Sequence, residues 1–83
     1  MNEELRRLAW QCRRGMLELD ELLGAFLEWA YPALDEELKA AFRQFLQEGD
    51  IDLFNWLFEA PGQAPERYAP LVARIRESRG IRS

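Results

Sequence analysis

The feature that most constrains the fold of this sequence is its near lack of β-branched residues. The 83 residues include no threonine, one valine and three isoleucines, against thirteen leucines. β-Branched residues favour strands, whereas leucine, alanine, glutamate and arginine favour helices. A chain of this length builds one hydrophobic core. The sequence therefore predicts an all-α fold, a compact five-helix bundle in which residues 1–83 form a single small domain.

Five segments carry apolar residues at the spacing of an amphipathic helix. The predicted helices cover about residues 2–14, 17–31, 35–48, 50–59 and 65–79. Capping residues, glycines and prolines mark their ends. The predicted N-caps are Asn2, Asp35 and Asp50, the predicted stops are Gly15, Pro32, Gly49 and Gly80, and Pro65 is placed in the first turn of the last helix. The residues after Gly80 are expected to be loose.

The fourth predicted helix is apolar on nearly every side, which one face of a small bundle cannot accommodate. Leu53 and Leu57 are expected to belong to the core, and at least one of Phe54, Trp56 and Phe58 is expected to stay partly exposed. Exposed aromatic side chains often contact a partner. An aromatic surface formed by Trp56 and Phe58 is therefore one candidate binding site.

Gly24 lies inside the second predicted helix, on the chain between Leu23 and Ala25. A glycine in a helix interior costs about 1 kcal/mol relative to alanine, because its unfolded backbone is freer. Close packing of another helix against this position is the expected reason for its presence.

The inventory of reactive side chains excludes most catalytic and metal sites. The chain contains no histidine, no threonine and one cysteine, and its two serines lie near the C-terminus. The usual nucleophile and general-base sets cannot be built from these residues, and neither can a soft metal site. Cys12 has no partner for an internal disulfide and is expected to be a small buried hydrophobe. We therefore expect no catalytic residues, no metal and no enzyme.

The net charge of −4 is unevenly distributed. Residues 15–66 carry twelve acidic residues against one lysine and one arginine, whereas residues 67–83 carry five arginines against one glutamate. An acidic middle argues against nucleic-acid binding, which needs a concentrated basic face. No apolar run approaches the ~20 residues of a membrane span, and the first residues do not form a signal or transit sequence. A cytoplasmic, monomeric protein without membrane insertion is expected.

The junction between the first two predicted helices combines arginines and carboxylates. Arg13 and Arg14 precede Gly15, and Glu18 and Asp20 follow it. One interpretation is structural: a glycine helix stop, favourable charges at two helix ends, and a local Arg14–Glu18 ion pair worth about 0.2–0.5 kcal/mol. The other is a charged surface that docks on a partner. In either case the exposed charges are expected to contribute little to folding stability.

Two segments resemble a known family. Residues 13–20 read RRGMLELD, which is similar to the R-G-x-x-E signature of the succinate dehydrogenase assembly factors, the small flavinylation factors of bacteria and mitochondria. Residues 52–57 read DLFNWL, which resembles the D-L-x-x-W-L segment of the fourth helix in that family. The likeness covers nearly the whole chain. One motif alone is a weak signal, but both at this spacing are a strong one.

The resemblance implies a five-helix bundle that promotes covalent attachment of FAD to the flavoprotein subunit of succinate dehydrogenase, and often of fumarate reductase. Arg14, Gly15 and Glu18 match the functional motif, and Arg13 and Asp20 flank it, so these five residues are the predicted partner-binding site. FAD is then attached to the client, and the chain itself is expected to bind no cofactor tightly. The bacterial, cytoplasmic branch fits best.

The implied mechanism is binding without catalysis, since a helper without histidine can act only by favouring a reactive conformer of its client. The alternative is an unrelated adaptor or antitoxin-like module that uses the aromatic surface at Trp56 and Phe58. A third class, an FAD-binding enzyme, would carry flavin absorbance when purified. The location of the binding surface distinguishes the first two.

Overall fold

Helices form most of the structure, a computed structural model that describes residues 3–79. The α-helices are α1 Glu3–Gln11, α2 Leu17–Trp29, α3 Glu36–Phe45, α4 Asp50–Phe54 and α5 Ala69–Ser78. A π-helical turn, Asn55–Glu59, continues α4, and single 3-10 turns lie at Tyr31–Ala33, Pro61–Gln63 and Glu66–Tyr68. The described residues contain no strand, so the predicted all-α class with five helices is confirmed.

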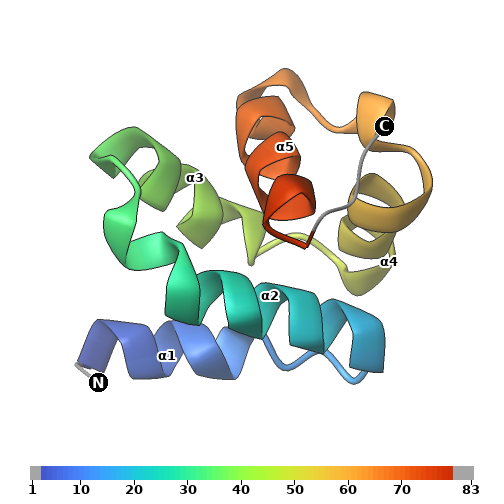
Figure 1. The fold of residues 1–83 in the computed structure, drawn as a ribbon. Coiled ribbons are helices and arrows are strands. Elements are labelled where there is room, and N and C mark those ends of the chain that lie inside the picture. The colour runs from blue at the N-terminus through green and yellow to red at the C-terminus, as the bar shows by residue number, and fades with distance from the viewer. Residues whose placement is uncertain (1–2, 80–83) are drawn as a thin grey trace.

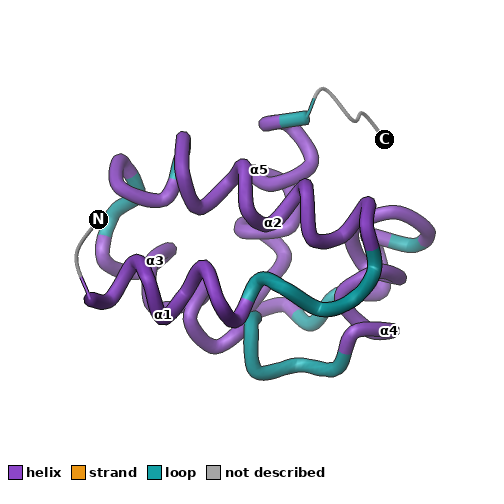
Figure 2. Tube along the Cα trace, turned by 90° about the horizontal axis from the view of Figure 1, so that it is seen from below, coloured by secondary structure: helices purple, strands orange, loops and turns teal. Residues whose placement is uncertain are grey.

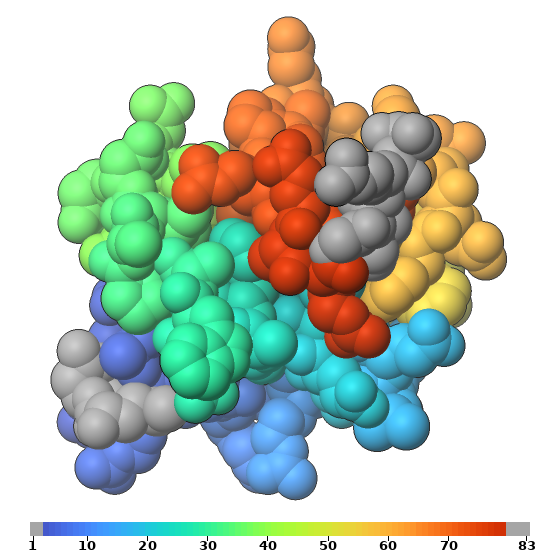
Figure 3. Space-filling model, viewed as in Figure 1, coloured from blue at the N-terminus to red at the C-terminus, as the bar shows by residue number. Residues whose placement is uncertain are grey.

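Helix α2 is the central element of the arrangement. It packs against α1 on one side and against α5 on another, and α5 also packs against α3. Helices α1 and α2 run antiparallel and side by side, joined by a short loop at one end of the molecule (Figure 1). In the space-filling view α1 forms the lower edge of the molecule, with α2 above it (Figure 3). One flank of α1 is therefore uncovered.

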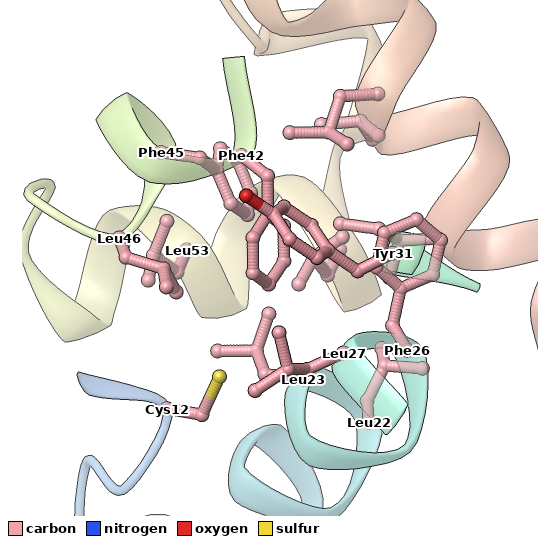
Figure 4. Close-up of a cluster of buried hydrophobic side chains, with 14 of the residues drawn as sticks. Cys12, Leu22, Leu23, Phe26, Leu27, Tyr31, Phe42, Phe45, Leu46 and Leu53 are labelled. Atoms are coloured by element: carbon pink, nitrogen blue, oxygen red, sulfur yellow. The ribbon is translucent and has the colours of Figure 1, made fainter. Parts of the chain in front are cut away.

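The core lies where the apolar stripes of the helices converge, as the predicted helical spacing requires. Phe42 of α3 is fully buried at its centre, and its ring lies 5.6 Å from that of Phe26 and 5.4 Å from that of Tyr31, measured between centroids. The predicted core face of α2 is confirmed, because the five large apolar residues of that face are buried, four of which are labelled in Figure 4. These are Leu19, Leu22, Leu23, Phe26 and Leu27.

The aromatic segment that continues α4 is partly core and partly surface, as predicted. Leu53 and Leu57 are fully buried, and the half-buried rings of Phe54 and Phe58 lie 4.8 Å apart. Trp56 is buried. Its ring packs between those of Phe45 and Tyr68, with centroid distances of 6.0 and 5.9 Å. The expectation that Trp56 offers a partner surface is therefore wrong, since its ring is occupied by the core.

Arg76 of α5 is buried against this segment. Its guanidinium donates a hydrogen bond to the backbone carbonyl of Leu57. In a continuing α-helix that carbonyl would accept from the N–H of residue 61, but residue 61 is Pro61 and has none. The arginine therefore satisfies a backbone acceptor that the turn at the end of the segment leaves without a partner.

Leu57 provides a direct test of this core. Leu57→Ala is expected to lower the free energy of unfolding by about 2–5 kcal/mol, because it removes fully buried methyl groups and leaves a cavity. Leu17→Ala is the matched control, since that leucine is 76% exposed and its truncation should cost less than about 0.5 kcal/mol. Urea denaturation of both variants measures the difference. Equal midpoints for the two variants would contradict this packing.

Several helix ends differ from the predicted ones. Asp35 caps α3 as expected, its carboxylate accepting the N–H of Leu38 at 2.8 Å. Helix α3 nevertheless ends before Gly49, which has φ −69° and is itself the N-cap of α4. The predicted cap Asp50 thus lies inside the first turn of α4. Helix α1 ends at Gln11 rather than at residue 14.

Helix α5 begins at Ala69, later than the predicted residue 65. Pro65 has extended backbone, with ψ 148°, and the 3-10 turn Glu66–Tyr68 separates it from the helix. Pro70 instead occupies the first turn of α5, where a missing N–H costs nothing. The predicted cap Asn2, the predicted stop Gly80 and the last three residues lie outside the described residues.

Gly24 has open space beside it, so close helix packing does not explain it. A Cβ atom built at this position meets no heavy atom within 4 Å. Its φ is not positive, so an L side chain fits the local backbone. The expectation of a tight helix contact is wrong. No packing contact within the fold offsets the energetic cost of this glycine.

Candidate functional site

The candidate site is the corner loop between α1 and α2, residues 12–16. Gly15 turns the chain there with φ +85°, a left-handed conformation that glycine adopts without strain. It is the one residue with positive φ within residues 3–79. A side chain at this position would strain the turn and shift its neighbours. The local reason for the corner is therefore the glycine that the sequence identified as a helix stop.

Asp20 holds the corner from the first turn of α2. Its carboxylate accepts hydrogen bonds from two consecutive backbone N–H groups, those of Arg14 at 2.8 Å and Gly15 at 3.2 Å. Neither N–H lies within a helix, so the carboxylate satisfies two donors that the loop leaves unpaired. Asp20 therefore shapes the loop, and its carboxylate is hydrogen-bonded within the fold.

Arg14 fastens the corner to the loop between α3 and α4. Its Nε lies 2.6 Å from the Asp50 carboxylate, and its terminal nitrogens donate to the carbonyls of Gln11 at 3.0 Å, Leu46 at 2.7 Å and Glu48 at 2.6 Å. The side chain is only 14% exposed. Figure 2 shows the two loops next to each other on the underside of the molecule. The planar fork of arginine fits such a set of diverging acceptors, which lysine does not.

The structural interpretation of the junction predicted an ion pair between Arg14 and Glu18, and that prediction is wrong. Arg14 forms its ion pair with Asp50 instead. Glu18 is exposed on the first turn of α2. Within residues 3–79 its carboxylate makes no side-chain hydrogen bond or ion pair. Arg13 is also exposed, and its guanidinium lies 5.3 Å from the centre of the Trp10 ring. The predicted site thus divides into a half-buried frame, Arg14 with Asp20, and exposed charges, Arg13 and Glu18.

Exposed apolar side chains also lie on the helices that meet at this corner, and they were not predicted from the sequence. Leu17 is 76% exposed, Ile51 80% and Trp10 71%. Leu17 and Ile51 lie in the first turns of α2 and α4, which begin at the same end of the molecule (Figure 1, Figure 2). The sequence did contain a signal for Leu17 and Ile51. Each is an apolar residue that lies next to a charged residue and outside the apolar stripe of its helix. Such apolar surface beside charge is typical of an interface.

Reactive chemistry is lacking at the corner. Cys12 is buried beneath it, and burial raises the pKa of its thiol to about 12, with Arg14 opposing the shift. The thiol is therefore neutral and a poor nucleophile. No group of metal-binding side chains occurs within the described part of the chain. Nor is any helix there long and apolar enough to cross a membrane.

Comparison with known proteins shows the family of this chain. The sequence model of the family described as flavinator of succinate dehydrogenase matches residues 6–79. The chain belongs to this family of flavinators. The resemblance seen in the sequence is thereby confirmed, and so is the interpretation as an assembly factor rather than an enzyme.

Bacterial relatives of this flavinator are named FAD assembly factor SdhE. The protein of Idiomarina loihiensis is 54% identical over 70 residues, which cover 84% of this chain and 78% of the relative. That of Pseudomonas aeruginosa is 52% identical over 56 residues, 68% of this chain and 67% of the relative. The Coxiella burnetii protein is 35% identical over 79 residues, 93% and 96% of the two chains. No solved structure matches the chain.

Proposed function

We propose that this flavinator binds the flavoprotein subunit of succinate dehydrogenase through its corner loop and promotes covalent attachment of FAD to that subunit. The flavoprotein of fumarate reductase is a second proposed client. The observation that carries the proposal is the exposed carboxylate of Glu18, which has no partner in residues 3–79. It lies on the first turn of α2, directly after a loop fastened by Arg14 and Asp20. Rigid presentation lowers the entropy lost on binding.

The proposed mechanism is selection of a client conformer. The chain has no histidine, so the residue that bonds to the flavin belongs to the client. A binding protein shifts its client only by the difference in its affinity for two client conformers. A charged hydrogen bond from Glu18 to a desolvated donor of the client supplies such a difference, and Leu17 and Ile51 exclude water around it. The flavinator thereby holds the client in the arrangement that favours attachment.

The partner-binding residues follow from this division of roles. Glu18 and Arg13 are proposed to touch the client, whereas Arg14, Gly15 and Asp20 hold them in place. Truncating one partner of a buried charged contact at an interface costs about 2–5 kcal/mol. We further propose that the protein acts as a monomer in the bacterial cytoplasm, a reducing compartment that suits its single unpaired Cys12.

Co-expression tests the proposed function. The client flavoprotein is produced with and without this protein in cells that lack their own flavinator, and covalent flavin is read as fluorescence of the client band on a denaturing gel. We expect a fluorescent band only when both proteins are present. A client that is equally flavinylated alone contradicts the proposal.

The alternative binding surface is tested in the same assay. Phe58 is half-buried beside Phe54, so the π-helical turn after α4 still offers some aromatic surface although Trp56 does not. If this turn is the docking surface, Phe58→Ala removes client binding and Glu18→Ala leaves it unchanged. If the corner is the docking surface, Glu18→Ala removes client binding and Phe58→Ala leaves it unchanged.

Free FAD is expected to bind the purified flavinator weakly, with a dissociation constant above about 10 µM, since the acidic side chains of this surface repel its phosphates. Glu18, Glu21 and Asp52 are all exposed near the starts of α2 and α4. Titration followed by flavin fluorescence measures the constant, with the purified client subunit as the positive control. A submicromolar constant for the flavinator alone would show that it holds the cofactor itself.

A further inference from the structure

A groove runs between α1 and α2, beside the corner loop. Its volume is about 370 Å3, within the roughly 300–1,000 Å3 range of ligand pockets. Apolar side chains form most of its walls, among them Leu5 and Ala9 of α1 and Leu27 of α2. The two helices are antiparallel (Figure 1). The residues that line the groove run from Cys12 back to Leu5 on the α1 side and from Asp20 to Glu28 on α2, so the groove extends away from the corner.

Two observations connect the groove to client binding. Arg13 and Asp20, which belong to the corner, also line the groove, so the two surfaces are continuous. Gly24 lines it from the middle of α2, where a Cβ atom would meet nothing within 4 Å. The backbone there does not require glycine, and the core does not touch the position. The missing side chain has one structural effect, which is to deepen the groove.

We propose that this groove is a second subsite of the client interface, and that it receives an apolar side chain of the flavoprotein next to the segment bound by the corner. The inference rests on the proposed function. An apolar walled groove beside a charged contact matches the usual anatomy of an interface, in which a buried apolar anchor lies next to polar groups. Glu28, which also lines the groove, gives it an acidic rim that suits a basic neighbour of that side chain.

The test separates binding from folding, because a side chain at position 24 is expected to stabilise the fold and to weaken client binding. Gly24→Ala is expected to raise the melting temperature by about 4 °C, since alanine is the better helix former. Gly24→Leu fills the groove, and it is expected to weaken binding of the client subunit at least about tenfold, with Gly24→Ala weakening it less. Ala25→Leu, at the exposed neighbouring position of the same helix, is the matched control and should bind like the unchanged protein.

Binding is measured by biolayer interferometry on the immobilised client, with thermal melts and light scattering of each flavinator variant. If both Gly24 variants bind the client like the unchanged protein while Glu18→Ala does not bind, the groove subsite is overturned. The proposed function still stands in that case. A dimer of the unchanged protein that Gly24→Leu converts to a monomer would also overturn it, since a second copy would then cover the groove. Absence of client binding by the unchanged protein defeats both proposals.

Discussion

Replacing Arg14 by alanine is expected to lower the free energy of unfolding by about 2–4 kcal/mol and to abolish client flavinylation. The substitution removes the guanidinium from the Asp50 carboxylate and from the carbonyls of Leu46 and Glu48. Because the side chain is only 14% exposed, water replaces these hydrogen bonds poorly. The corner loop then separates from the loop between α3 and α4, and the presented charge of Glu18 loses its fixed position.

Arg13→Ala is the matched control for this variant. Arg13 carries the same charge one residue earlier, but it is exposed, and within residues 3–79 its side chain interacts only with the Trp10 ring. Its removal should change stability by less than about 0.5 kcal/mol. Urea denaturation monitored by circular dichroism compares the two variants. Equal unfolding midpoints would show that the Arg14 hydrogen bonds contribute nothing to the fold.

Replacing Glu18 by alanine is expected to give the opposite combination, a stable protein that does not support flavinylation. The exposed side chain has no partner in residues 3–79, so its loss should cost the fold less than about 0.5 kcal/mol. The proposed contact with a desolvated donor of the client is worth about 2–5 kcal/mol on truncation, which weakens client binding by at least tenfold. Covalent flavin on the co-expressed client and the melting temperature are measured together.

Glu21→Ala controls for the loss of one negative charge from the same helix. Glu21 is exposed on α2 like Glu18 but lies outside the R-G-x-x-E segment of residues 14–18, so its variant should flavinylate the client normally. Glu18→Gln separates charge from shape, and we expect it to retain only a small part of the activity because a neutral acceptor forms the weaker hydrogen bond. Normal flavinylation by Glu18→Ala would mean that the corner is only a structural turn.

Local sequence alone determined most of the fold. The apolar spacing in residues 17–31 predicted the buried face of α2, because a helix that must bury one stripe leaves that stripe visible in the chain. Asp35 was identified as a cap and Gly15 as a turn for equally local reasons, since capping and positive φ depend on one residue and its neighbours. The motif at the corner was likewise visible as a run of adjacent residues.

Only the tertiary structure decided what the motif residues do. The rule for pairs four residues apart holds when both lie on one helix, but α1 ends at Gln11 and Gly15 turns the chain, so Arg14 and Glu18 do not share a helix. Its actual partner, Asp50, is 36 residues away along the chain. No local pattern specifies a contact of that separation, because it depends on how the α3–α4 loop packs beneath the corner. The same holds for the open groove beside Gly24, which exists only once α1 lies against α2.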